Sequence, residues 1–204
     1  MMSPSRANVN RMIENSLPPR RGMTEVLFPF FAWHAGSPLE GPAFTQAFLK
    51  HRPDEHWVLV GEGVAQCHAQ LWTAWHSAAR RQQRGTSLAR SFDAEFLRYL
   101  AGTHHVSEAF KRAGVRNEDL FGCFLRLPVG EGSIETLPQP DAEQAAMIES
   151  QAADLAASLG VELTSKGLEC TTEGAERLGL LSIDTGTPTC DALVGHVLSA
   201  EFHS

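Results

Sequence analysis

Glycines divide the middle of this chain into three helix-length segments. From Val64 to about Arg84, apolar and aromatic side chains recur every three or four residues, which predicts an amphipathic helix. Gly85 follows that segment, Gly102 follows the next, and Gly114 follows the third. Glycine is a usual residue just beyond the last turn of a helix. The pattern therefore predicts three consecutive helices, with Ser91 and Thr103 as N-caps of the second and third.

The flanking segments predict a sheet and further helices. Strands are expected over residues 24–33, 57–60, 120–127 and 161–163, and helices over 42–50, 141–160, 172–181 and from Thr187 to the C-terminal region. Pro29 suggests an edge position or a bulge for the first strand. Strands and helices do not alternate strictly. The predicted fold is therefore α+β, a single domain with a small mixed or antiparallel sheet packed against several helices.

Composition and the N-terminal region narrow the class of protein. Residues 1–22 are polar and turn-rich, so we predict a disordered extension there and one domain over 23–204. No run of about 18 apolar residues predicts a membrane span. The four cysteines lie far apart without a Cys-x-x-Cys pair, which argues against a zinc site and a dense disulfide scaffold. Reduced thiols in a cytoplasmic protein are expected.

Basic residues are concentrated in one window of an acidic chain. Between Arg80 and Arg116 there are eight basic and three acidic residues, against nine basic and 21 acidic residues elsewhere. Such a segment is a plausible footprint for a polyanion, because neutralising phosphates releases counterions. The alternative is a solvated helical face whose charges pair with acidic segments elsewhere.

Motifs for catalysis are absent from the sequence. We find no Gly-x-Ser-x-Gly elbow, no phosphate-binding glycine loop, and no kinase signature. The nine histidines include no His-x-x-x-His, and His68 on an apolar stripe reads as a core residue with a hydrogen-bond partner. These absences remove the commonest hydrolase and phosphotransfer routes, and we expect no metal and no cofactor.

Thr103, His104 and His105 stand at the start of the third predicted helix. Free backbone N–H groups there form a ready anion site, and imidazoles can donate to phosphate or stack on a base. The helix dipole opposes their protonation, so they are expected to act mostly as neutral groups. An exposed cap with incidental histidines is the alternative.

A resemblance to a known family rests on the stretch from Ala89 to Val115, ARSFDAEFLRYLAGTHHVSEAFKRAGV. It resembles the central signature of the KEOPS kinase-binding subunit, called the PRPK-binding protein in eukaryotes. That family has a helix ending in Ala/Ser-Gly, a short x-Arg-Gln-Ile step, and a helix reading x-x-Ala-x-x-x-x-Gly. The resemblance covers roughly residues 24–202, and its specific part is 64–127.

The resemblance implies a non-catalytic subunit that binds the N-lobe of a small atypical kinase/ATPase and holds the 3′ CCA end of tRNA. The transferase subunit of such a complex installs threonylcarbamoyl on the adenosine beside the anticodon, and the remaining subunits are contacted indirectly. His104 and His105 replace the Arg-Gln of the family, so a permanent charge becomes a neutral or switchable one.

The resemblance and the basic window together suggest which residues would contact RNA and the kinase. Single-stranded RNA is held by cations and stacking side chains, which gives as candidates Arg80, Arg81, Arg84, Arg98, His104, His105 and Lys111. The candidates for kinase contact are Leu193, Val197 and Leu198 on the final helix, for which core packing is the alternative. Two other functions stay open: a kinase-binding adaptor without RNA contact, and a small histidine-dependent metalloenzyme.

Overall fold

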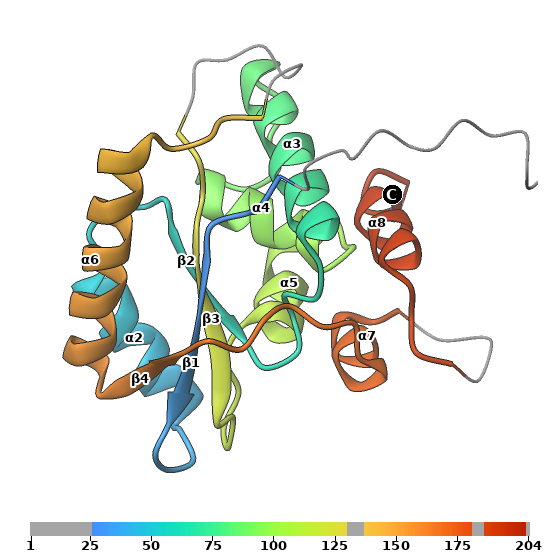
Figure 1. Ribbon diagram of the computed structural model, residues 1–204. Coiled ribbons are helices and arrows are strands. Elements are labelled where there is room, and N and C mark those ends of the chain that lie inside the picture. Colours follow the sequence, from blue (N-terminus) through green and yellow to red (C-terminus); the bar gives the residue numbers. More distant parts are fainter. Residues whose placement is uncertain (1–25, 130–136, 181–185, 203–204) are drawn as a thin grey trace, which may run out of the picture.

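The computed structural model describes residues 26–129, 137–180 and 186–202, so the predicted extension over 1–22 lies outside the described residues. Within these ranges the chain forms seven helices and four strands, in the order β1 (Phe30–Ala35), α2 (Gly41–His51), β2 (Trp57–Gly61), α3 (His68–Gln83), α4 (Phe92–Leu100), α5 (Val106–Ala113), β3 (Phe121–Arg126), α6 (Ala142–Leu159), β4 (Val161–Thr164), α7 (Thr172–Leu178) and α8 (Cys190–Ser199). The predicted α+β class is confirmed (Figure 1).

The sheet is antiparallel throughout, with strand order β2-β3-β1-β4. The expectation of an edge position for the first strand is wrong, because β1 lies between β3 and β4. It begins only after Pro29, whose carbonyl accepts from the backbone N–H of Arg126 at 3.1 Å. The preceding residues are bound by side chains of α3: Trp72 Nε1 donates to Val26 O, and the N–H of Phe28 donates to His68 Nδ1. Side-chain contacts thus replace the strand pairing expected before residue 30.

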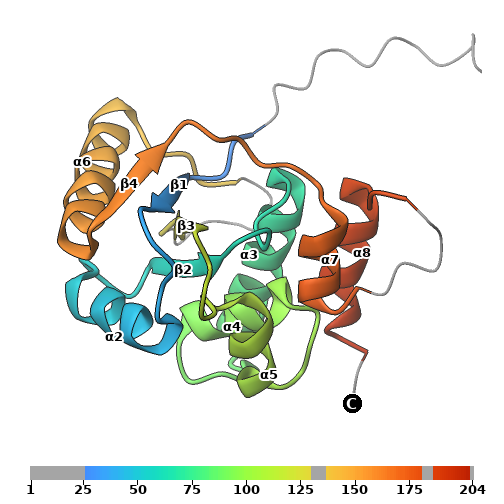
Figure 2. The same ribbon diagram turned by 90° about the horizontal axis from the view of Figure 1, so that it is seen from below.

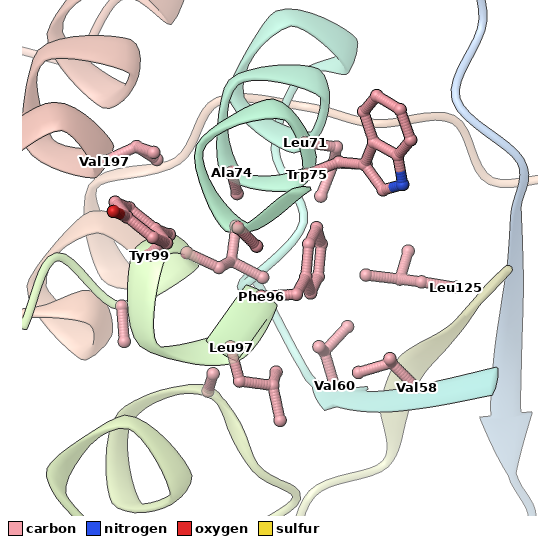
Figure 3. Packing of buried hydrophobic residues seen from close by; sticks show 14 of the residues in the cluster. Val58, Val60, Leu71, Ala74, Trp75, Phe96, Leu97, Tyr99, Leu125 and Val197 are labelled. Carbon is pink, nitrogen blue, oxygen red and sulfur yellow. The ribbon is translucent and has the colours of Figure 1, made fainter. Parts of the chain in front are cut away.

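Helices cover both faces of the sheet (Figure 2). On one face, α2 and α6 pack over a cluster that includes Trp33 and Phe124. On the other face, α3, α4 and α5 pack over a second cluster that includes Val60 and Leu125 (Figure 3). Alternate residues of a strand point to opposite faces, so β2 and β3 each supply both clusters, whereas β4 supplies only Val161, to the first. The two apolar clusters place the sheet at the centre of the domain.

The helices α7 and α8 form an outer layer beyond α3–α5, on the side away from α2 and α6 (Figures 1 and 2). Val197 of α8 is buried against the cluster that contains Tyr99 of α4 (Figure 3). A disulfide joins Cys67, the N-cap of α3, to Cys190, the first residue of α8. The expectation of reduced cysteines is therefore wrong for this pair, because the fold brings together residues 123 positions apart.

Local signals explain most helix ends, with two corrections. The long helix α6 starts at a capping box between Asp141 and Gln144 and ends at Gly160 in the left-handed conformation, as predicted. The helix expected from Val64 begins only at His68, because the Gln70 side chain bonds the backbone of residues 64 and 66 instead.

The cap of the final helix also differs from its prediction. It is Thr189 rather than Thr187, since the Thr189 hydroxyl accepts from the N–H of Ala192.

Candidate nucleic-acid interface at the Gly102 loop

The turn between α4 and α5 lies on one wall of a cavity of about 370 Å³, lined by residues 102–105 together with Arg112, Gly179 and His196. Gly102 has a φ of 58°, and its N–H donates to Tyr99 O at 2.9 Å, which turns the chain sharply after α4. The next segment is anchored by the N–H of Thr103, which donates to Arg98 O at 3.1 Å. The cavity therefore has a hydrogen-bonded loop on one side, with Gly179 just after α7 and His196 of α8 on the other.

A buried ion pair lies beneath this loop. Arg98 and Glu95 have side chains only 0% and 1% exposed, and Arg98 Nη2 lies 2.7 Å from Glu95 Oε1. Arg98 Nη1 donates to Thr103 O at 3.1 Å and to Ala200 O at 3.4 Å. The predicted RNA contact of Arg98 is excluded in this structure, because its guanidinium is enclosed; it positions the loop and the end of α8.

The two adjacent histidines lie in different environments. His104 is half-buried, and its Nε2 atom is buried with no hydrogen-bond partner among the described residues. Burial lowers the pKa of His104 below its usual value, and the nearby charges of Arg98 and Arg81 lower it further. His105 is exposed and is the N-cap of α5, and its N–H donates to the Thr103 hydroxyl at 3.2 Å. Thr103 thus bonds the cap, whereas it was expected to be the cap itself.

Two side chains of the cavity, Arg112 and His196, were missing from the candidate set, and both contact the carbonyl oxygen of Leu178 on α7. Arg112 donates from Nη1 to Ala101 O and to Leu178 O, both at 3.2 Å. His196 of α8 lies with its Nε2 3.2 Å from Leu178 O. Arg112 belongs to the basic window and was detectable there, but His196 has no signal in the sequence, since only tertiary packing brings α8 to this loop.

The basic residues at the end of α3 lie close to the C-terminal segment. Arg81 forms an ion pair with Glu201 at 2.7 Å, Arg80 lies 3.7 Å from the same carboxylate, and Tyr99 donates a short hydrogen bond to it. Burial raises the pKa of Glu201, but the hydrogen bonds from Arg81 and Tyr99 outweigh it and hold the pKa below its usual value. Arg80 and Arg81 are therefore engaged by an acid that the sequence did not single out.

The remaining RNA candidates are on the surface. Arg84, the C-cap of α3, is exposed. Lys111 on α5 has a side chain 77% exposed, and its Nζ lies 4.0 Å from Glu108, a separation at which a surface pair contributes little. Neither residue lines the cavity. The structure thus groups His104 and His105 in the cavity and leaves Arg84 and Lys111 outside it.

The three kinase-contact candidates on α8 divide between the core and the surface. Leu193 and Val197 are completely buried, so their predicted contact with a partner is not available in this structure. Leu198 is 41% exposed, and Phe202, four residues further along, is 81% exposed. We call Leu198 and Phe202 the apolar edge of the C-terminal segment. The hydrophobic periodicity of α8 identified the helix but not which of its sides faces the core.

A larger cavity of about 540 Å³ lies over β1 and β3, beneath residues 164–171. Among the cations that line it, Arg177 makes a two-point ion pair with Asp119 at 3.0 and 2.8 Å and also donates to Gly114 O at 2.6 Å. That arginine joins α7 to the segment before β3, so its hydrogen bonds are structural ones. The Gly102 cavity is the stronger candidate site, because its histidine donors are not all used within the fold.

Comparison with known proteins identifies no family for this chain, and the described residues form no metal centre. Neither a protein-family model nor a curated protein matches this sequence. Over the described ranges, no three His, Cys, Asp or Glu side chains are grouped so as to hold a metal ion. In the same part of the chain, no helix has the length and apolar character needed to cross a membrane.

Proposed function

We propose that this chain is a non-catalytic accessory subunit of a KEOPS-type complex that modifies tRNA with threonylcarbamoyladenosine. In this proposal the Gly102 cavity holds the 3′ CCA end of tRNA, and the apolar edge at Leu198 and Phe202 binds the small atypical kinase/ATPase. The observation that carries the proposal is that the turn over 102–105, which lies within the Ala89–Val115 stretch that resembles that family, lines a cavity.

The chemistry of the cavity suits a single-stranded RNA end. The first N–H groups of α5 lie beside residues 104 and 105, and a helix N-terminus favours phosphate. An exposed imidazole such as His105 can stack on a base or donate to a phosphate oxygen. The lowered pKa of His104 keeps that ring neutral at pH 7, so it acts through hydrogen bonding rather than charge. Long-range attraction for the polyanion then comes from exposed cations such as Arg84 and Lys111.

Kinase binding is assigned to the apolar edge because of its exposure. Large apolar side chains that are exposed at the surface favour burial against a partner. Leu198 and Phe202 are both exposed near the end of α8, and the bond from Phe202 N to Ser199 O keeps the chain turning there, so the two side chains lie within one short exposed segment.

The test for RNA binding compares intact tRNA with tRNA lacking its CCA end in a filter-binding assay. We expect the intact form to bind more tightly, and His105→Ala to reduce that difference. Lys50→Ala on α2, across the sheet from the loop, is the control and should leave the difference unchanged. Equal affinity for both tRNAs would contradict the assignment of the cavity.

A second candidate function is a kinase-binding adaptor without RNA contact. The observation in its favour is that Arg98 is buried and that Arg80 and Arg81 lie against Glu201, so three of the predicted RNA cations are engaged within the fold. Co-purification of the kinase together with an absence of tRNA binding would support this adaptor over the main proposal.

A further inference from the structure

The Cys67–Cys190 disulfide joins α8 to the start of α3. Both cysteines are half-buried, so a small thiol or the exposed thiol of an oxidoreductase can approach the sulfur atoms. The bond joins residues 123 positions apart and cross-links the outer layer to the start of α3.

The two ends of α8 are held in different ways. At the C-terminal end, Val197 and Ala200 are fully buried, Ala200 O accepts from Arg98, and Glu201 pairs with Arg81. At the N-terminal end, Leu193 is the buried residue of the first turn, and its neighbours Asp191 and Ala192 are exposed. The first turn of α8 therefore depends on the disulfide far more than its last turn does.

That first turn is connected to the Gly102 cavity. His196 lies less than two turns after Cys190 and forms one wall of the cavity. The contact is close, because a Cβ added to Gly102 would lie 2.5 Å from His196 Cε1. A movement of α8 that extends from its first turn to His196 would therefore displace the wall that faces the Gly102–His105 turn.

We propose that Cys67–Cys190 is a thiol–disulfide exchange site for a dithiol reductant, and that its opening loosens α8 from its first turn as far as His196, the residue that forms one wall of the Gly102 cavity. An incoming thiolate attacks one of the two sulfur atoms, the S–S bond breaks, and a mixed disulfide forms. The second thiol of the reductant, as its thiolate, then displaces the cysteine from the mixed disulfide. The two cysteines end as thiols after gaining two electrons and two protons, and the dithiol ends as a disulfide. The expected effect of this opening on tRNA binding rests on the proposed function.

A third cysteine lies close to this site. Cys170 Sγ lies 4.0 Å from the carbonyl oxygen of Gln66, the residue before Cys67. Burial raises the pKa of the Cys170 thiol, and the Glu169 carboxylate raises it further, so the thiol stays protonated at neutral pH. Because the thiolate is the attacking form, the disulfide is protected from internal exchange with Cys170.

The experiment uses the full chain in its oxidised form and after treatment with dithiothreitol. Alkylation and mass spectrometry count the thiols, and amide hydrogen exchange is followed over 190–195 and over 197–202. We expect two additional alkylated cysteines on reduction and exchange roughly tenfold faster over 190–195, with little change over 197–202. Unchanged exchange over 190–195 after complete reduction would overturn the proposal, as would an oxidised chain in which all four cysteines alkylate.

Variants separate this effect from other actions of the reductant. Cys190→Ser should exchange fast over 190–195 with or without dithiothreitol, whereas Cys170→Ser should respond as the unmodified chain does. The unmodified chain tests the proposal even where Cys190→Ser does not fold. Binding of intact tRNA is then measured for both redox states, and we expect several-fold weaker binding after reduction. A chain that binds no tRNA in either state contradicts the proposed function, while hydrogen exchange still decides the present proposal.

Discussion

Gly102 lies directly against the imidazole of His196, and a Cβ built on Gly102 would lie only 2.4 Å from His196 Nε2. The two residues belong to segments that are far apart in the chain, the α4–α5 turn and α8. Their contact closes the cavity that we assign to RNA, and it requires a residue without a side chain at position 102. The positive φ of 58° imposes the same requirement on the backbone.

Substitution of Gly102 by alanine should therefore destabilise the protein for two reasons. The left-handed backbone alone costs about 1–3 kcal/mol with a side chain present, and displacement of the His196 ring adds to this. Gly85→Ala is the matched control, since Gly85 has a φ of 64° but open space where its Cβ would lie. Urea unfolding followed by tryptophan fluorescence measures both. An equal decrease in the free energy of unfolding in the two variants would show that the His196 contact does not contribute to the cost of a side chain at position 102.

Removal of the buried Arg98 charge should destabilise the fold more than removal of an exposed arginine. In Arg98→Met, Glu95 remains buried without its cation, and breaking such a pair typically costs about 3–5 kcal/mol. The exposed Arg90 provides the comparison, and Arg90→Met should change the free energy of unfolding by less than about 0.5 kcal/mol. The same unfolding assay checks this prediction, and similar losses for both variants would contradict the structural role of Arg98.

Substitutions on the buried and exposed sides of α8 should have different effects, the first on the stability of the fold and the second on kinase binding. Leu193→Ala removes a fully buried side chain and should cost about 2–5 kcal/mol of unfolding free energy. Leu198→Ala alters an exposed side chain and should cost less than about 0.5 kcal/mol, yet weaken capture of the kinase. Thermal unfolding and pull-down with the purified kinase measure the two effects. Full kinase capture by a doubly substituted Leu198→Ala, Phe202→Ala chain would exclude the apolar edge as the docking site.

Stability should fall as the pH falls below about 6.5, partly through His104. Burial and the charges of Arg98 and Arg81 lower its pKa in the folded state below the ordinary 6.5. The unfolded chain then takes up the proton first, so the stability that His104 contributes is complete above pH 6.5. It is lost as the pH drops toward the folded-state pKa. We expect the free energy of unfolding to decrease from pH 7.5 to 5.5.

The corresponding variant is His104→Gln, in which this decrease should be smaller. His76 has a pKa lowered in the same direction by burial and by Arg80, so part of the decrease should persist. Urea unfolding at the two pH values measures the difference, and an identical decrease in both proteins would remove His104 from the explanation.

The sequence predicted the ends of a helix correctly where those ends depend on residues within one helical turn. The capping box at Asp141 and the left-handed Gly160 bound α6 because both act within one helical turn. The start of α3 was predicted four residues too early, because a side-chain network around Gln70 competes with the helix there. Of the candidate site, the turn at residues 102–105 was found from sequence, whereas His196 and Glu201 were not, since both come from the far end of the chain.

The sequence by itself determined the α+β class, the positions of the glycine-terminated helices and the basic window. These properties depend on side-chain periodicity and on the conformational freedom of single residues. Only the tertiary structure decided which polar groups are available: it buries Arg98, pairs Arg81 with Glu201, turns Leu193 and Val197 inward, and joins Cys67 to Cys190. The physical reason is that periodicity shows that a helix has an apolar side but not which partner covers it, and long-range pairing depends on how the layers pack.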